Sequence, residues 1–124
     1  MPTNIQTLWI GKTMPMINHH CLRSMTKYHT VEIYTYSKID NLPQNTDHGV
    51  ILKDANEIIK EEDLFYFNET DIAPFSDLFR FKLLLLKGGY WLDLDIFLLK
   101  PINYKLTEFI IGSERTMLVG AFKS

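Results

Sequence analysis

The chain has 124 residues, a formal net charge of -2 at pH 7 and one cysteine, Cys21, and 46% of its residues are hydrophobic. This length and composition predict one compact, ordered domain and exclude a multidomain or disordered chain, while the slight acidity argues against a dedicated nucleic-acid binder. A lone cysteine forms no internal disulfide, the longest apolar run (residues 83–86) is too short to cross a bilayer, and no secretion signal opens the chain, so we expect a cytoplasmic protein without a membrane span.

The first third of the chain predicts a strand, a helix and a second strand. Residues 5–10 are mostly apolar and stop at Gly11, which is typical of a short buried strand. Pro15 suits the first turn of the following helix. Four residues at helical spacing define the helix face that we expect to be buried: Ile17, Cys21, Met25 and Tyr28. Residues 31–36 are β-branched and aromatic, and their distance from the first strand favours a parallel βαβ unit.

The middle of the chain is less regular. Residues 37–49 have the composition of a surface loop, and residues 50–52 predict a third short strand. Residues 55–60 predict a short helix, and the acidic residues 61–63 that follow are interpreted as a solvated turn. We assign no chemistry to this part of the chain.

Residues 76–87 predict a second helix. Ser76 is a suitable N-cap, Asp77 favours the positive end of the helix dipole, and the glycines at 88–89 stop the helix. Apolar side chains surround most of its axis, so we expect it to be largely buried. Residues 90–99 then predict a strand, with further short strands at 109–111 and 117–119. The order of elements predicts an α/β fold with a mostly parallel sheet flanked by helices.

Asp93 and Asp95 are candidate ligand-binding residues. On a strand, residues two apart point to the same face, which Trp91 and Phe97 would share. Two carboxylates among large aromatic side chains are costly unless a cation or a ligand offsets their charge, and such oxygen ligands suit Mn²⁺ or Mg²⁺. A solvated edge strand is the alternative.

Asp77 and Arg80 lie three residues apart on the helix predicted at 76–87. They form a simple ion pair in one interpretation. In the other, they line a pocket, because the rest of this helix is almost entirely apolar and the two glycines bring the next strand back beside it.

Five sequence segments together resemble the family of sugar transferases that contain a DXD motif. This family includes the yeast initiating mannosyltransferases and the glucosyltransferase domains of the large clostridial toxins. The likeness extends from about residue 5 to residue 101 and rests on residues 75–80 (FSDLFR), 86–95 (LKGGYWLDLD), 99–101 (LKP), 8–11 (LWIG) and Pro15.

The resemblance implies a GT-A fold, a Rossmann-like fold that binds a nucleoside-diphosphate sugar, and the use of Mn²⁺ or Mg²⁺. It assigns Trp9 to stacking on the base, Asp77 and Arg80 to hydrogen bonds with the donor sugar, and Asp93 to ribose or sugar hydroxyls. It assigns Asp95 to the metal that clamps the diphosphate, with Asp93 beside it in the metal site. A UDP-linked donor is favoured over a GDP-linked one, the acceptor is a carbohydrate or a protein, and relatives transfer the sugar with retention.

The chain departs from the family pattern in two respects. The position directly before Leu-Asp-x-Asp more often holds Tyr, and here Trp91 would pack on the nucleotide without a phenol hydrogen bond. Catalytic domains of the family are also longer, so we expect residues 1–124 to form one glycosyltransferase domain that comprises the donor-binding half without the acceptor part. The alternatives are a non-catalytic nucleotide-sugar-binding module and a haloacid-dehalogenase-type phosphatase.

The remaining chemically active side chains carry no motif. His19 and His20 are adjacent, so on a helix they diverge by about 100° and are interpreted as exposed. His29 and His48 are interpreted as solvated, and Cys21 as a small core residue.

Overall fold

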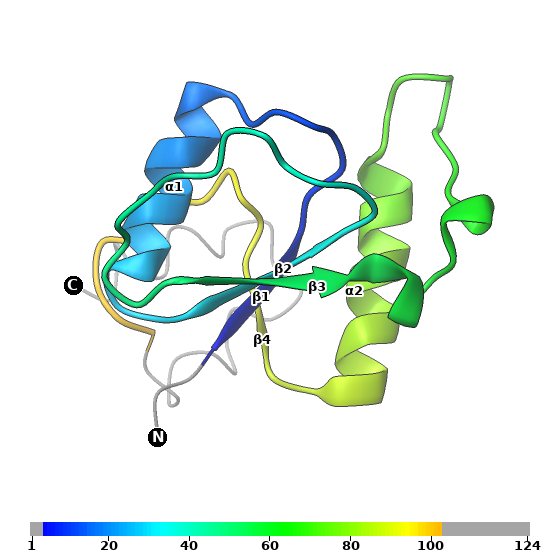
Figure 1. Ribbon diagram of the computed structural model, residues 1–124. Helices are drawn as coiled ribbons and strands as arrows, with labels where there is room; N and C mark the ends of the chain where they lie inside the picture. The colour runs from blue at the N-terminus through cyan, green and yellow to red at the C-terminus, as the bar shows by residue number, and fades with distance from the viewer. Residues whose placement is uncertain (1–3, 103–124) are drawn as a thin grey trace.

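A parallel sheet with the strand order β3-β2-β1-β4 forms the centre of the protein (Figure 1). The computed structural model describes residues 4–102 of the chain. The strands are β1 (Ile5–Leu8), β2 (Val31–Thr35), β3 (Val50–Asp54) and β4 (Tyr90–Trp91). The helices are α1 (Met16–Thr26) and α2 (Ala73–Lys87), with short 3-10 helices η1 (Ala55–Glu57) and η2 (Glu61–Asp63). The predicted α/β class with a parallel sheet is confirmed.

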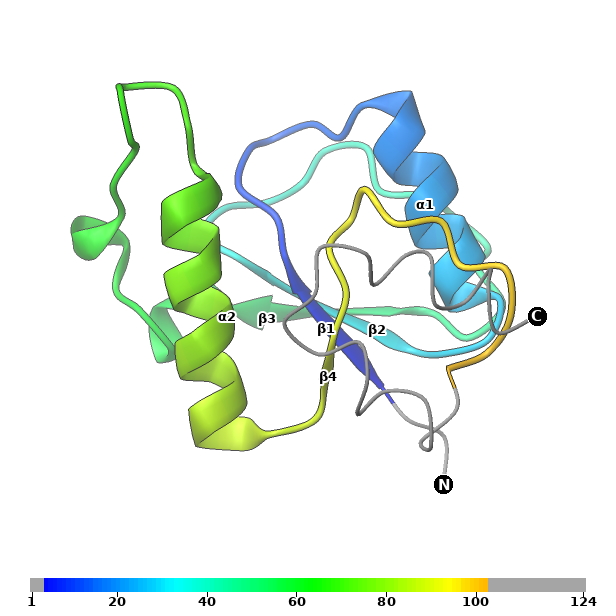
Figure 2. The same ribbon diagram turned by 180° about the vertical axis from the view of Figure 1, so that it is seen from behind.

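The two helices lie on opposite faces of the sheet (Figures 1 and 2). The step from β1 through α1 to β2 and the step from β3 through α2 to β4 run in opposite directions across the sheet. Because such crossovers are right-handed, their helices cover opposite faces. Each face of the sheet carries its own hydrophobic core, and side chains of β2 point alternately into the two. Val31 and Ile33 pack on the α1 side, and Tyr34 packs on the α2 side. Neither helix is long and apolar enough to cross a bilayer, as far as residues 4–102 show.

Helix α1 matches its prediction except at its start and end. Cys21 and Met25 are buried as expected. Ile17, however, is 65% exposed, because it lies in the first turn, and Leu22 packs on the sheet instead. Tyr28 follows the end of the helix and is half-buried against the same core.

Helix α2 begins at Ala73, three residues earlier than predicted, so Ser76 lies within it and is not the N-cap. Proline in the first turn explains the earlier start, since its fixed φ suits that position. The expectation that this helix is largely buried is wrong. One face packs on the sheet through Phe75, Phe79 and Leu83, whereas four large apolar side chains on its other faces are exposed: Leu78, Phe81, Leu85 and Leu86.

Strand β4 has two residues instead of the ten predicted. Tyr90 pairs with Ile5 of β1 and Trp91 pairs with Gln6, and the chain then leaves the sheet. The period-two burial pattern nevertheless continues, because one side of the segment still faces the core. The buried side chains are Leu92, Leu94, Ile96 and Leu98, and the exposed ones are Asp93, Asp95, Phe97 and Leu99.

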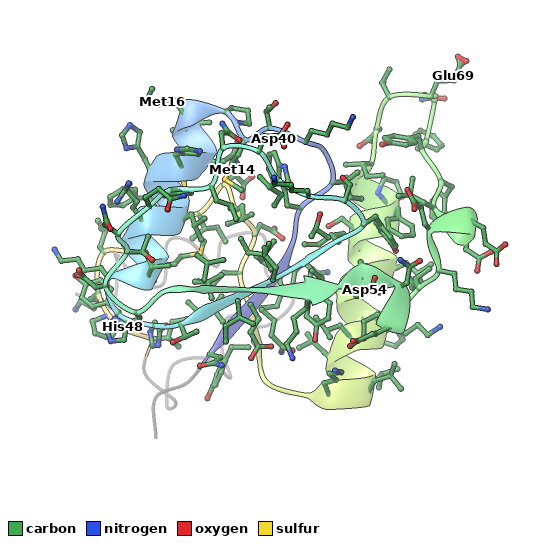
Figure 3. All side chains as sticks on the ribbon, viewed as in Figure 1. Met14, Met16, Asp40, His48, Asp54 and Glu69 are labelled. Carbon is green, nitrogen blue, oxygen red and sulfur yellow. The ribbon has the colours of Figure 1, made fainter. Side chains whose placement is uncertain are left out.

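The middle of the chain follows its prediction closely. Residues 37–49 form a loop, and β3 extends two residues further than expected. The helix predicted at 55–60 is reduced to η1. Asp54, labelled in Figure 3, caps the start of η1, because its side chain accepts from the Asn56 amide over 2.9 Å. The acidic residues 61–63 are exposed in η2. The strands predicted at 109–111 and 117–119 lie outside the described residues.

A tight turn at Gly88 and Gly89 brings the chain from α2 into β4. Both glycines have positive φ, 67° and 94°. The Gln6 side chain of β1 donates from Nε2 to the Gly88 carbonyl over 2.7 Å. A Cβ atom on Gly89 would lie 2.7 Å from that same nitrogen, which is too close for two heavy atoms that are not bonded. The turn therefore depends on glycine for its backbone angle and for the approach of Gln6.

We expect Gly89→Ala to destabilise the fold by about 0.5 to 1.5 kcal/mol more than Gly49→Ala, because the added Cβ displaces the end of the Gln6 side chain and breaks its hydrogen bond to the Gly88 carbonyl. Gly49 also has positive φ, 86°, but a Cβ there meets nothing within 4 Å. The comparison therefore separates the clash with Gln6 from backbone strain. Urea unfolding of both variants measures the difference, and equal losses would contradict the role given to Gln6.

Phe79→Ala is expected to cost about 3 to 5 kcal/mol of unfolding free energy, because Phe79 is fully buried against Tyr34, Phe75 and Trp91. Phe81→Ala, on the exposed side of the same helix, is the matched control and should change stability by less than about 0.5 kcal/mol. Thermal or urea unfolding tests the pair. A large loss in the Phe81 variant would mean that its face of α2 is covered in solution.

Candidate functional site

The candidate site lies at the carboxyl edge of the sheet, where the strand order changes direction. The chain builds the sheet from β1 to β2 to β3 and then returns to add β4 on the other side of β1. In open α/β sheets, ligands bind at such a switch point, outside the carboxyl ends of the strands. Trp9 follows the end of β1, and Asp93 and Asp95 follow the end of β4. Because β1 and β4 are parallel neighbours, these residues leave the sheet at the same edge.

The Asp93 carboxylate is held by the side chain of Trp91. The indole Nε1 donates to Asp93 Oδ1 over 2.7 Å. The indole ring is half-buried and packs against Phe79 of α2, with ring centroids 6.3 Å apart. A charge-assisted hydrogen bond of this length orients one carboxylate oxygen firmly. Trp91 therefore links the core under α2 to the first aspartate of the motif.

Asp95 lies in a turn whose backbone is held by α1. The Ile96 amide donates to the Asp93 carbonyl over 3.1 Å, which closes the turn around Leu94 and Asp95. Asn18 Nδ2, on α1, donates to the Leu94 carbonyl over 2.9 Å. The negative charge of Asp95 also raises the pKa of the Cys21 thiol of α1, after the larger effect of burial. The Asn18 hydrogen bond thus places residues 93–96, called the acidic loop below, against α1.

The chain that follows the motif lies along α1 and is fixed there by three further hydrogen bonds. The Leu98 amide donates to Ser24 Oγ over 2.8 Å, and Tyr28 Oη donates to the Leu99 carbonyl over 3.2 Å. The Ile102 amide donates to Nε2 of His29 over 3.0 Å. These contacts were not predicted, because no sequence pattern indicates which distant backbone a polar side chain on a helix will meet.

Two predictions about histidines are wrong. His29 is 5% exposed instead of solvated, because its ring accepts a hydrogen bond from the segment beside α1. His19 is half-buried, since it lies on the part of α1 that faces the protein, whereas His20 is exposed as expected. Cys21 is buried and free, as predicted for a core residue. His48 is exposed and its Nδ1 lies 2.9 Å from the Thr26 carbonyl.

Asp77 and Arg80 form an ion pair on α2, with 3.7 Å between Oδ1 and Nη2. Their side chains are 69% and 32% exposed, so this pair contributes little to stability. Among residues 4–102, no hydrogen bond or ion pair joins them to Asp93 or Asp95. The N-terminal half of α2 does lie at the same end of the sheet as the carboxyl ends of β1 and β4 (Figures 1 and 2).

Trp9 contributes to the core and lies at the switch point. Its ring is half-buried against the apolar cluster under α1, and its backbone amide donates to the Tyr34 carbonyl over 2.9 Å. Within the described chain, the buried indole Nε1 has no hydrogen-bond partner. A Cβ on Gly11 would lie 3.6 Å from that nitrogen, so the chain passes close to the edge of the ring.

The donor atoms at this edge fit a cation that takes much of its coordination shell from other sources. Asp93 and Asp95 are exposed, and residues 4–102 hold no cluster of three or more His, Cys, Asp or Glu side chains suited to a metal. Mg²⁺ and similar ions are commonly held by one or two carboxylates together with water and substrate phosphates. The sequence predicts that the two carboxylates destabilise the fold unless a cation offsets their charge. Because both are exposed to solvent, the fold needs no cation for this purpose.

Comparison with known families matches most of the chain to one family. A model of the family described as "Glycosyltransferase sugar-binding region containing DXD motif" matches residues 7–115, which is most of the chain. The matched range includes Trp9, Asp77, Arg80 and the acidic loop. Neither the curated proteins nor the solved structures gave a significant match. The parallel sheet between two helices agrees with part of a GT-A, Rossmann-like domain.

We expect the Cys21 thiol to react with a disulfide reagent at pH 8 on the order of a hundredfold more slowly in the native protein than in urea. Burial, and secondarily the charge of Asp95, raise the pKa of Cys21, so both its access and its thiolate fraction fall on folding.

Removing the charge of Asp95 should lower the Cys21 pKa and speed the native reaction, whereas Asp47→Asn on the exposed loop should leave the rate unchanged. Stopped-flow absorbance measures both rates. Equal rates for Asp95→Asn and the wild type would place Asp95 farther from α1 than the structure has it.

Proposed function

Because the chain belongs to the family of glycosyltransferase sugar-binding regions that contain a DXD motif, we propose that it binds a nucleoside-diphosphate sugar at the edge between β1 and β4. The observation that carries this proposal is the topology. The reversal of strand order puts Trp9 on one side of the switch point and Asp93 and Asp95 on the other. A nucleotide bound there would reach both sides with its base and its diphosphate.

Each candidate residue has a proposed role. Trp9 stacks on the base through its half-buried ring. Asp95 binds Mn²⁺ or Mg²⁺, which neutralises charge on the departing diphosphate. Asp93, oriented by Trp91, binds hydroxyl groups of the ribose or sugar and lies beside the metal. Asp77 and Arg80 exchange their exposed ion pair for hydrogen bonds to the donor sugar.

The acidic loop supports joint binding of metal and nucleotide. Residues 4–102 supply two carboxylates and no larger cluster, so among the described residues there are few ligands and a diphosphate is the proposed source of further ones. We therefore propose weak binding of Mn²⁺ alone and tighter binding in the presence of a nucleoside diphosphate. UDP is favoured over GDP.

The proposed activity is transfer of the sugar, with retention, to a carbohydrate or protein acceptor. A binding module without turnover is the second candidate. Hydrolysis of the sugar nucleotide in the presence of Mn²⁺ distinguishes the two. The phosphatase alternative is disfavoured, because the family match covers the acidic motif and that motif follows the last described strand instead of the first.

Calorimetric titration with UDP and with GDP, each with and without Mn²⁺, tests the proposed site. We expect UDP to bind more tightly with Mn²⁺, and Asp95→Asn to weaken this binding at least about tenfold, which is about 1.4 kcal/mol. The reason is the loss of a charged oxygen ligand. Asp47→Asn removes an equal charge on the exposed loop and should bind like the wild type.

The result that contradicts the proposal is equal binding by the wild type and Asp95→Asn. If Mn²⁺ changes the affinity for neither UDP nor GDP, the metal has no role in the site. Tighter binding of GDP would correct the nucleotide while leaving the location intact.

A further inference from the structure

The backbone carbonyl of Leu94, between the two aspartates, needs a hydrogen-bond donor that the sheet does not supply. The Leu94 side chain is 4% exposed, and the chain has left the ladder with β1 at this point. A backbone carbonyl in a buried turn needs a donor, since an unpaired one is costly. Asn18 supplies that donor from α1, at 2.9 Å and across 76 residues of sequence.

Asn18 is itself rigidly placed. It lies in the first turn of α1, and its backbone amide donates to the Pro15 carbonyl over 3.0 Å. Its side chain is half-buried, which limits the rotamers that it can adopt. The amide group therefore presents its donor to the acidic loop from the first turn of α1.

The hydrogen bond controls more than one atom of the loop. The Leu94 carbonyl belongs to the peptide group that joins Leu94 to Asp95, so the orientation of this group influences the direction in which the Asp95 side chain leaves the backbone. The turn is closed on its other side by the Ile96 amide, which donates to the Asp93 carbonyl. Trp91 holds the Asp93 carboxylate, but no comparable side-chain contact holds Asp95 within residues 4–102. The position of Asp95 thus depends on the backbone of this turn.

We propose that Asn18 is a positioning residue, whose side-chain amide holds the Leu94 peptide so that Asp95 is preorganised for a metal and diphosphate. The effect on ligand binding rests on the proposed function, whereas the ordering of the loop does not. Binding sites lose affinity when the groups that orient their ligands are removed, typically by about 10- to 100-fold for metals. Asn18 acts through the loop and touches no reacting atom.

Ser24 offers a matched control on the same helix. It also makes one side-chain hydrogen bond to the segment that follows the motif, but its partner is the Leu98 amide, three residues beyond Asp95. Ser24→Ala therefore removes a bond to the same segment without touching the turn, together with the bond from Ser24 Oγ to the Cys21 carbonyl within α1. A general weakening of the packing on α1 would follow from both variants, and a specific effect on the turn from Asn18 alone.

The first measurement is amide hydrogen exchange of Ile96 and Leu98 by NMR, without any ligand. In Asn18→Leu, which keeps a similar size and lacks the donor, we expect Ile96 to exchange at least about tenfold faster than in the wild type. In Ser24→Ala, Leu98 should exchange faster and Ile96 at its wild-type rate. Asn18→Ala replaces the Leu variant if that variant does not fold.

The second measurement is titration of the same variants with UDP, with and without Mn²⁺. Asn18→Leu should weaken the binding of UDP with Mn²⁺ about tenfold and change the binding of UDP without Mn²⁺ much less, because Trp91 still orients Asp93 in this variant. Ser24→Ala should lower Tm and leave both affinities at wild-type values.

The two measurements separate the possible failures. Unchanged Ile96 exchange in Asn18→Leu overturns the proposal whatever the nucleotide data show. Faster Ile96 exchange with an unchanged effect of Mn²⁺ overturns the positioning role and leaves a structural hydrogen bond. If the wild type binds neither UDP nor GDP in the presence of Mn²⁺, the proposed function and the ligand part of this inference fail together, while the exchange data still decide whether Asn18 orders the loop.

Discussion

The parallel pairing of β4 with β1 is the constraint on which the arrangement of the site depends. It places the chain after β4 beside the chain after β1, and it reverses the order in which strands are added to the sheet. The pairing is short, with two residue pairs, so the turn before it has to be placed accurately. Gln6 and the two glycines provide this placement, since the Gln6 side chain binds the turn from the strand that β4 will join.

The same pairing determines how the two cores are divided. With β4 on the far side of β1, the helix that precedes it covers the opposite face from α1. Helix α2 buries one face through Phe75, Phe79 and Leu83, and the rest of its surface stays open among the described residues. Helix α1 packs on the sheet and also holds the segment after the acidic motif. Hydrogen bonds from its polar side chains thereby replace the backbone pairing that a longer β4 would have made.

The acidic loop is accordingly supported from both sides of the sheet. Trp91 connects Asp93 to the core under α2, and Asn18 connects the Leu94 peptide to α1. The carboxylates themselves are exposed, so they add little strain to the fold and remain available to a ligand. An exposed pair of aspartates on a well-supported loop suits a site at which the substrate brings part of the metal shell.

Local patterns were enough to predict β1, α1, β2, β3 and the glycine stop of α2, because apolar periodicity and turn chemistry act within a few residues. The alternating burial after Trp91 was also predictable, since it requires only that one side of the segment face a core. The extent of β4 was not, because it depends on when the chain leaves β1. The exposure of α2 and the partners of Asn18, Ser24 and His29 depend on which distant elements meet, and the resemblance of the motif to a family says nothing about them. Sequence spacing thus located the candidate ligands, while packing between residues 70 or more positions apart determined what holds the segment after Trp91 against α1.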